Sequence, residues 1–147
     1  MVRRDFIERL IQQVAEAVGL VLGLSRSGKL THALDVVHQT IALVLGPDHA
    51  LLERMEATSA VDFIGKFELD RIRLYAGLLA EEGTIHERRG ALNDAQRCRR
   101  HALELYAAGS LAGLRLDEAD QERVALLRTK VDLDGLAPRY RDALQHL

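Results

Sequence analysis

The residues most suggestive of chemistry begin at Gly23, where the chain reads Gly-Leu-Ser-Arg-Ser-Gly-Lys as far as Lys29. This stretch matches the first part of the phosphate-binding loop, in which backbone N–H groups surround the phosphates and a lysine reaches the terminal ones. The hydroxyl that would hold Mg²⁺ is due at the next position, which is Leu30, and a helical pattern rather than a strand precedes the loop. The sequence therefore argues against nucleotide binding here, and no cofactor is expected.

Histidines are the next candidates, as metal ligands. No two of them stand four residues apart, the helical spacing that brings two imidazoles to one ion. His86-Glu87 matches only half of the motif that zinc peptidases place on a helix. The pattern favours scattered solvated histidines, and no metal site is predicted from it. The set is His32, His38, His49, His86, His101 and His146.

Cys98 is the only cysteine, so it cannot form a disulfide within the chain. This usage suits a reducing compartment, and we expect the protein to be cytoplasmic. Cys98 is expected to be a small buried apolar group. A redox role stays open as the alternative, because the neighbouring Arg97 and Arg99 would favour a thiolate.

A basic patch lies in residues 86–101, where arginines outnumber Glu87 and Asp94. Surfaces that bind nucleic acid usually add exposed aromatic side chains or a recognised motif, and neither is interleaved here. The pattern favours a solvated helical face, with phosphate contact and partner binding as alternatives. The patch consists of Arg88, Arg89, Arg97, Arg99 and Arg100.

Nucleophilic catalysis has no support in the sequence. No serine stands in a Gly-x-Ser-x-Gly elbow, and Cys98 has no histidine at a spacing that argues for a catalytic pair. We therefore expect a protein that is not an enzyme.

Length and composition indicate the kind of domain that carries these residues. A chain of 147 residues that is 48% apolar and 29% charged is typical of one globular domain, predicted to span residues 1–147. The net charge of −2 creates no overall field that attracts nucleic acid or anionic lipid. The longest apolar run covers only residues 17–24, whereas a bilayer span needs about 20 residues. Asp5 and Glu8 interrupt the stretch that a signal peptide needs, so no membrane association is expected.

Apolar residues recur at steps of three and four along most of the chain, which is the period of one helical face. No segment shows sustained alternation of β-branched residues, so an all-α protein of about 6–8 helices is predicted. In the first run, from Phe6 to Leu24, apolar residues also occupy the opposite side, and we expect its second half to be covered nearly all round, for example by another subunit.

Turn residues and caps divide the chain into its helices. Glycine-containing turns at Gly28, at Gly46-Pro47 and at Gly90 end helical runs, and Ala108-Gly109-Ser110 is expected to end another. Thr58 or Ser59 is predicted to cap a short helix, and Asp117 a later one.

Residues 79–103 follow the small-residue pattern of a tetratricopeptide unit. Gly83 occupies the eighth position of that unit and Gly90 the turn between its helices. Ala95 and Ala102 occupy the two small positions where the helices touch, because larger side chains there would push the helices apart. The pattern therefore predicts an antiparallel helical hairpin.

The same segment departs from the tetratricopeptide pattern at several positions. Glu82 replaces an apolar residue, and His86 and Arg99 replace aromatic ones. The closing proline is replaced by Ala107. A first hairpin around Gly28 matches less well, and the two hairpins do not keep the 34-residue repeat, so no regular array is predicted.

From Asp5-Phe6-Ile7 through Gly28-Lys29 to the second hairpin, the chain resembles an uncharacterised bacterial family of similar length with tetratricopeptide-like helical hairpins. The resemblance covers nearly the whole chain and implies an α-α superhelix of antiparallel hairpins. Its motifs are packing motifs and specify no ligand. Several repeats are usually needed to close a solenoid core, so a homodimer is expected.

The hairpins and the lack of catalytic groupings predict a non-catalytic interaction or scaffold domain that binds a protein or peptide. Tetratricopeptide-like proteins commonly bind peptides in a groove lined by the first helices, which here would include Glu81, Thr84, Glu87 and Arg88. The two carboxylates favour a basic or mixed peptide. The alternatives are a nucleic-acid-associated protein that uses the Arg88–Arg100 patch, and a protein with an apolar-ligand pocket or an enzyme.

Overall fold

The computed structural model describes the backbone of residues 2–147 and the side chains of residues 4–147. Residues 2–147 form helices and turns with no strand, which confirms the all-α prediction. None of the described helices is long and apolar enough to cross a bilayer. The helices are α1 (Val2–Arg26), α2 (Leu30–Leu45), α3 (His49–Leu52), α4 (Ala57–Ile64), α5 (Leu69–Arg88), α6 (Leu92–Leu111), α7 (Glu118–Lys130) and α8 (Pro138–Gln145), with 3₁₀ turns at Gly46–Asp48 and Leu133–Gly135.

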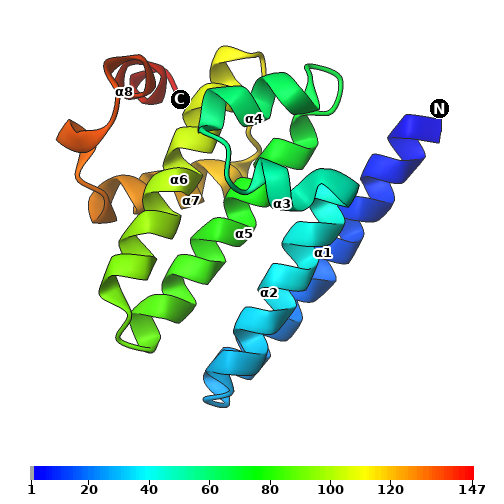
Figure 1. The fold of residues 1–147 in the computed structure, drawn as a ribbon, viewed down its shortest axis with the longest axis vertical. Helices are drawn as coiled ribbons and strands as arrows, with labels where there is room; N and C mark the ends of the chain where they lie inside the picture. Colours follow the sequence, from blue (N-terminus) through cyan, green and yellow to red (C-terminus); the bar gives the residue numbers. More distant parts are fainter. Residues whose placement is uncertain (1) are drawn as a thin grey trace.

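Helices α1 and α2 lie side by side at one edge of the molecule (Figure 1). Gly23 to Arg26 belong to α1, so the segment that matched a phosphate-binding loop is mostly helical. The turn to α2 contains Gly28, whose φ of +76° is a left-handed conformation that glycine adopts without strain. The sequence thus joins the two helices through a short turn at the predicted place.

Helix α2 packs against α5, and an arginine fixes the contact. Arg71, in the first turn of α5, donates from Nε to the carbonyl of Val44 at 2.8 Å and from Nη2 to the carbonyl of Leu45. These carbonyls end α2 and lack partners within their own helix, and the positive guanidinium also suits the negative end of the helix dipole. The last turn of α2 is therefore held on the first turn of α5.

The closest helix pair is α5 and α6 (Figure 1). A Cβ at Gly83 would lie 2.9 Å from Cγ of Arg99 and 3.3 Å from the carbonyl oxygen of Ala95, so only glycine fits this crossing. Ala95 and Ala102, the two predicted small positions of α6, are both buried. Gly90 has open space around it and a φ of +79°, so its role is the turn rather than the helix contact.

The C-terminal helices close the other side of α6. Helix α7 begins with the predicted N-cap: Oδ1 of Asp117 accepts from the backbone N–H of Asp120 at 2.8 Å, and the Asp120 carboxylate accepts from Asp117 N–H in return. Helix α8 is anchored by Tyr140, a buried residue whose hydroxyl lies 2.8 Å from Thr58 Oγ1 and donates to Glu56. The chain end is thereby tied to α4.

Two predicted helix ends are wrong. The cap of α4 is Glu56, whose Oε1 accepts from the backbone N–H of Thr58, in place of the expected Thr58 or Ser59 side chain. Helix α6 continues through Gly109 to Leu111, and Leu114 folds back onto Gly109, where a Cβ would meet its Cδ2 at 2.7 Å. Gly109 therefore marks a close contact with Leu114 and not the end of the helix.

In the single chain, the second half of α1 is covered on one face only. Leu20 is 53% exposed and Leu22 is 43% exposed, while Gly19 and Gly23 have no neighbouring atoms within 4 Å of a Cβ position. One face of α1 packs on α2 and α5, and the opposite face points to solvent in the single chain. The apolar residues on the opposite face of α1 therefore form a surface that the rest of this chain does not cover.

We expect Gly83→Val to lower the free energy of unfolding by about 1–3 kcal/mol, because the added methyl groups overpack the α5–α6 crossing. Gly19→Val is the matched control, since it places the same side chain within a helix where nothing lies within 4 Å. Urea denaturation of both variants measures the difference. Equal effects at the two positions would contradict the packing explanation.

Candidate functional site

A polar cleft opens where α2, the α3–α4 connection, α5 and α6 meet, with a volume of about 670 Å³. It collects histidine, cysteine and carboxylate side chains from segments that are far apart in the sequence. Its lining consists of His38, Glu53, Arg54, Met55, Glu56, Tyr75, Leu79, Glu82, His86, Asp94, Arg97, Cys98, Arg100, His101 and Glu104.

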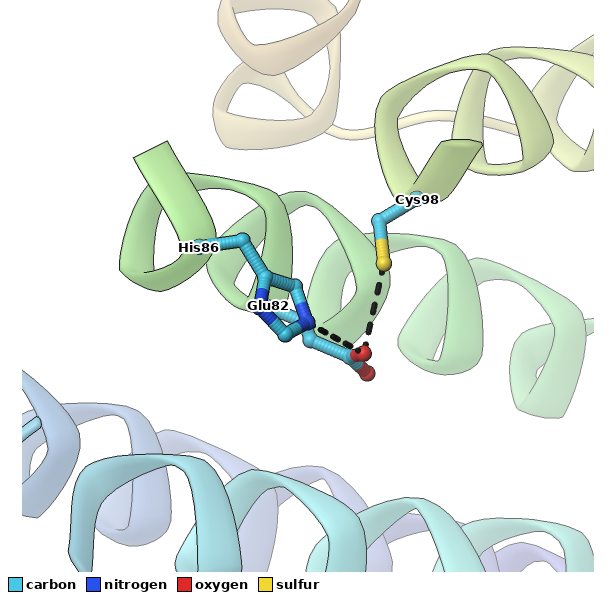
Figure 2. A group of neighbouring side chains, drawn as sticks. All are labelled: Glu82, His86 and Cys98. Carbon is cyan, nitrogen blue, oxygen red and sulfur yellow. Dashed lines mark hydrogen bonds and ion pairs between the residues drawn. The ribbon is translucent and has the colours of Figure 1, made fainter. Parts of the chain in front are cut away.

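Glu82 is the centre of this cleft (Figure 2). Its Oε2 lies 3.1 Å from Nε2 of His86, one helical turn along α5, and accepts from Sγ of Cys98 on α6 at 3.2 Å. Its Oε1 lies 3.3 Å from Nε2 of His38 on α2. One carboxylate therefore joins three helices.

The Glu82 carboxylate is ionised although it is mostly buried, with 13% of the side chain exposed. Burial on its own would raise its pKa, but the hydrogen bonds and the charge of His38, together with the bonds from Cys98 and His86, lower the pKa below the ordinary glutamate value. In return, the hydrogen bond to Glu82 raises the pKa of His38. A negative charge is thus held in place at the bottom of the cleft.

Cys98 is a partly buried thiol that donates to the Glu82 carboxylate. Burial, followed by the nearby charge of Glu82, raises its pKa well above the ordinary value. The arginines that flank it turn elsewhere: Arg97 pairs with Asp94, and Arg99 donates to Glu87 at 3.0 Å. The prediction of a small buried apolar cysteine is therefore wrong, because the thiol is only partly buried and donates to Glu82. The redox alternative stays a prediction.

The expectation that the histidines are scattered and solvated is wrong for His86, which is only 8% exposed. Among the described residues, Nδ1 of His86 and Nε2 of His101 are buried without a hydrogen-bond partner. The His101 ring lies edge-on to Tyr75, with the ring centroids 6.0 Å apart. Two imidazoles in the cleft thus retain unused polar atoms, which is unusual for buried groups.

The cluster offers donor atoms for a metal ion. One ligand atom each of Glu82, His86 and Cys98 lies within 4.8 Å of the others. Sequence reasoning missed this group because it compared histidines only with one another. The available signal was the replacement of expected apolar and aromatic residues by Glu82 and His86.

A second, smaller hollow of about 300 Å³ lies on another face of α5, against α7. Two of the four predicted partner-binding residues, Glu81 and Thr84, line it. An exposed apolar side chain, Leu126, lies at its edge with 58% of the residue accessible. The full lining is Ala80, Glu81, Thr84, Arg99, Ala119, Glu122, Arg123, Leu126, Leu127 and Lys130.

The other two predicted residues are placed differently. Glu87 contacts two residues that line the hollow, Arg99 at 3.0 Å and Lys130 at 3.7 Å. Arg88 instead donates to the carbonyl of Ser25 at 2.7 Å, near the end of α1. Three of the four predicted residues thus belong to the α5–α7 hollow or its immediate border, and Arg88 joins α5 to α1.

The charged form of Glu81 is disfavoured by its surroundings in this hollow. Its side chain is 20% exposed, and burial raises its pKa above the ordinary value. The guanidinium of Arg123 opposes this effect only partly, because the closest nitrogen is 3.9 Å from the carboxylate. A buried carboxylate with an incomplete partner is typical of a functional position.

The predicted arginine patch does not form one continuous cationic surface. Arg99 is 4% exposed and bonds to Glu87, and Arg97 pairs with Asp94. Arg100 donates to the carbonyl of Gly135. Arg88, Arg97, Arg99 and Arg100 thus each bond to a group of this chain.

Comparisons of the chain with protein-family models, curated proteins and solved structures find no match. The resemblance to a bacterial family with tetratricopeptide-like hairpins therefore stays a prediction. The function has to be inferred from the geometry of the two sites.

We expect Glu81→Gln to raise the free energy of unfolding at neutral pH, because it removes a buried charge. A carboxyl with a raised pKa in the folded state binds a proton more tightly there, so its destabilising effect is present above the folded pKa and disappears below the ordinary value of 4.5. The stability difference from the wild type should therefore shrink as the pH falls from the raised pKa of Glu81 towards 4.5, and stay constant below this value. Denaturation curves over a pH series measure it.

Glu122→Gln serves as the control for this experiment, because Glu122 is an exposed carboxylate that lines the same hollow. Its effect is expected to stay within about 0.5 kcal/mol at every pH. A Glu81→Gln variant that is less stable than the wild type at neutral pH would contradict the conclusion that the charge of Glu81 destabilises the fold.

Proposed function

We propose that this chain is a non-catalytic interaction domain that binds a peptide segment of a partner protein in the hollow between α5 and α7. The observation that carries the proposal is the arrangement of Glu81 and Thr84, predicted as partner-binding residues, beside the exposed Leu126. Helix α5 is the first helix of the second predicted hairpin, which is the helix that lines the peptide groove in tetratricopeptide-like proteins. A superhelix of this type is part of the proposal.

The lining of the hollow favours a segment of mixed charge with an apolar anchor. Glu81 and Glu122 offer carboxylates, and Arg123 and Lys130 offer cations. Charges of both signs select a complementary sequence and disfavour a uniformly charged one. An apolar side chain of the partner would cover Leu126, and such buried anchors supply most of the binding energy at protein interfaces.

A homodimer remains part of the proposal, with α1 as its surface. Leu20 and Leu22 are exposed on this helix, and a second copy would remove them from water. We also place the protein in the cytoplasm, a location that suits the unpaired thiol of Cys98.

The nucleic-acid alternative has less support than the interaction role. Binding of phosphates needs cations that are free to meet them, and Arg97, Arg99 and Arg100 already bond to groups of this chain. Arg99 is also buried, so it is not available on the surface. Three of the five arginines in the stretch therefore already have partners within the folded chain.

Selection from a library of random peptides displayed on phage tests the interaction role. We expect the wild type to enrich related peptides of mixed charge with an apolar residue. Thr84→Arg should weaken binding of an enriched peptide at least about tenfold, because the large cation fills the hollow. Fluorescence anisotropy with the labelled peptide measures the affinities.

Thr129→Arg is the matched control, since Thr129 is an exposed threonine of α7 that does not line the hollow. This variant should bind the peptide as the wild type does. The proposal fails if no peptide is enriched, or if the enriched peptides bind both variants equally well.

A further inference from the structure

We propose that Glu82, His86 and Cys98 form a binding site for one transition-metal ion of the zinc class. The three residues offer a carboxylate oxygen, an imidazole nitrogen and a sulfur atom at the bottom of the cleft between α2, α5 and α6 (Figure 2). This site lies on a different face of α5 from the peptide hollow. The proposal therefore goes beyond the interaction role and does not depend on it.

The spacing of the donor atoms already approaches that of a coordination shell. In a tetrahedral zinc site, bonds of about 2.0–2.3 Å place neighbouring ligand atoms roughly 3.3–3.6 Å apart. Oε2 of Glu82 lies 3.1 Å from Nε2 of His86 and 3.2 Å from Sγ of Cys98. The ligand atoms of His86 and Cys98 also lie within 4.8 Å of one another.

The helices hold these donors in place. Glu82 and His86 stand four residues apart on α5, which stacks them on one face of the helix. Cys98 approaches from α6, because Gly83 allows the two helices to come close beside these residues. A site built on packed helices loses little conformational freedom when it binds an ion.

The surroundings complete the site in the way expected of a metal centre. Nε2 of His38 lies 3.3 Å from Oε1 of Glu82, the oxygen that is not shared with His86 and Cys98. This contact orients the carboxylate, as outer hydrogen bonds orient metal ligands in general. His86 is also more than nine-tenths buried, yet its Nδ1 has no hydrogen-bond partner among the described residues. Hydrogen bonding within the protein therefore leaves this ring only partly satisfied.

The donor set determines which metal fits. Sulfur and imidazole nitrogen prefer borderline and soft ions, whereas Mg²⁺ and Ca²⁺ prefer shells made of oxygen alone. Three protein ligands leave a fourth position, which in this site opens into the cleft and would hold a water molecule. On binding, a sulfur–metal bond replaces the S–H bond of Cys98, and the proton passes to the buffer without oxidation of any group.

Titration of the chelator-treated protein with Zn²⁺ and with Co²⁺ tests the site. We expect one Zn²⁺ per chain, with a Kd of about 1 µM or tighter by calorimetry, and release of a proton. Co²⁺ should give an absorption band from charge transfer between the thiolate and the metal. Mg²⁺ and Ca²⁺ should give no signal.

Variants identify the ligands. Cys98→Ala should abolish the charge-transfer band, and both Cys98→Ala and His86→Gln should weaken Zn²⁺ binding at least about tenfold. His38→Gln should keep the band while it weakens binding about tenfold, because His38 positions the carboxylate and does not contact the ion. His32→Gln, an exposed histidine of α2 away from the cleft, is the control and should bind like the wild type.

A measurement on the unchanged protein guards against variants that fail to fold. Bound Zn²⁺ should slow alkylation of Cys98 at least about tenfold, because a metal-bound thiolate is a poorer nucleophile than a free one. An unchanged alkylation rate, no stoichiometric binding of Zn²⁺, or binding by Cys98→Ala equal to that of His32→Gln would overturn the proposal. Failure of peptide binding at Thr84 would leave it intact, because the two sites are separate.

Discussion

The close approach of α5 and α6 at Gly83 is the contact on which the described arrangement depends. With no side chain at this position, Arg99 and the backbone of Ala95 come within van der Waals distance of α5. Glu82 precedes Gly83, and Cys98 precedes Arg99. The close approach therefore brings these two residues together, with Oε2 of Glu82 3.2 Å from Sγ of Cys98. A packing requirement between two helices thus creates a polar contact that neither helix would form alone.

Helix α5 carries both candidate sites because it is surrounded by other helices. One face contacts α6, another faces the cleft beside α2, and a third lies against α7. Residues that are adjacent in the sequence, such as Glu81 and Glu82, therefore belong to different sites and have opposite pKa shifts. Glu82 has three donors that favour its charge, whereas Glu81 has one distant guanidinium. The surroundings, and not the residue type, decide which carboxylate is stabilised.

Much of the fold could be predicted from the sequence, because helical periodicity and turn glycines are local properties. The steps of three and four, the turns at Gly28 and Gly90 and the Asp117 cap act through neighbouring residues, and each appears at or near the predicted place. The errors occurred at helix ends, where side-chain contacts decide among neighbouring residues. Gly109 looked like a turn residue, but it lies within α6, which ends at Leu111, and Leu114 packs on it.

The sequence by itself determined the helical class, the small residues at the α5–α6 crossing and the polar side chains that each helix carries. Only the tertiary structure decided which helix covers which face, and hence that Glu82 meets both Cys98 and His38. The physical reason is that periodicity fixes the direction of a side chain about its own helix axis but carries no information about the neighbouring helix. Contacts between distant segments form only when the whole core has packed.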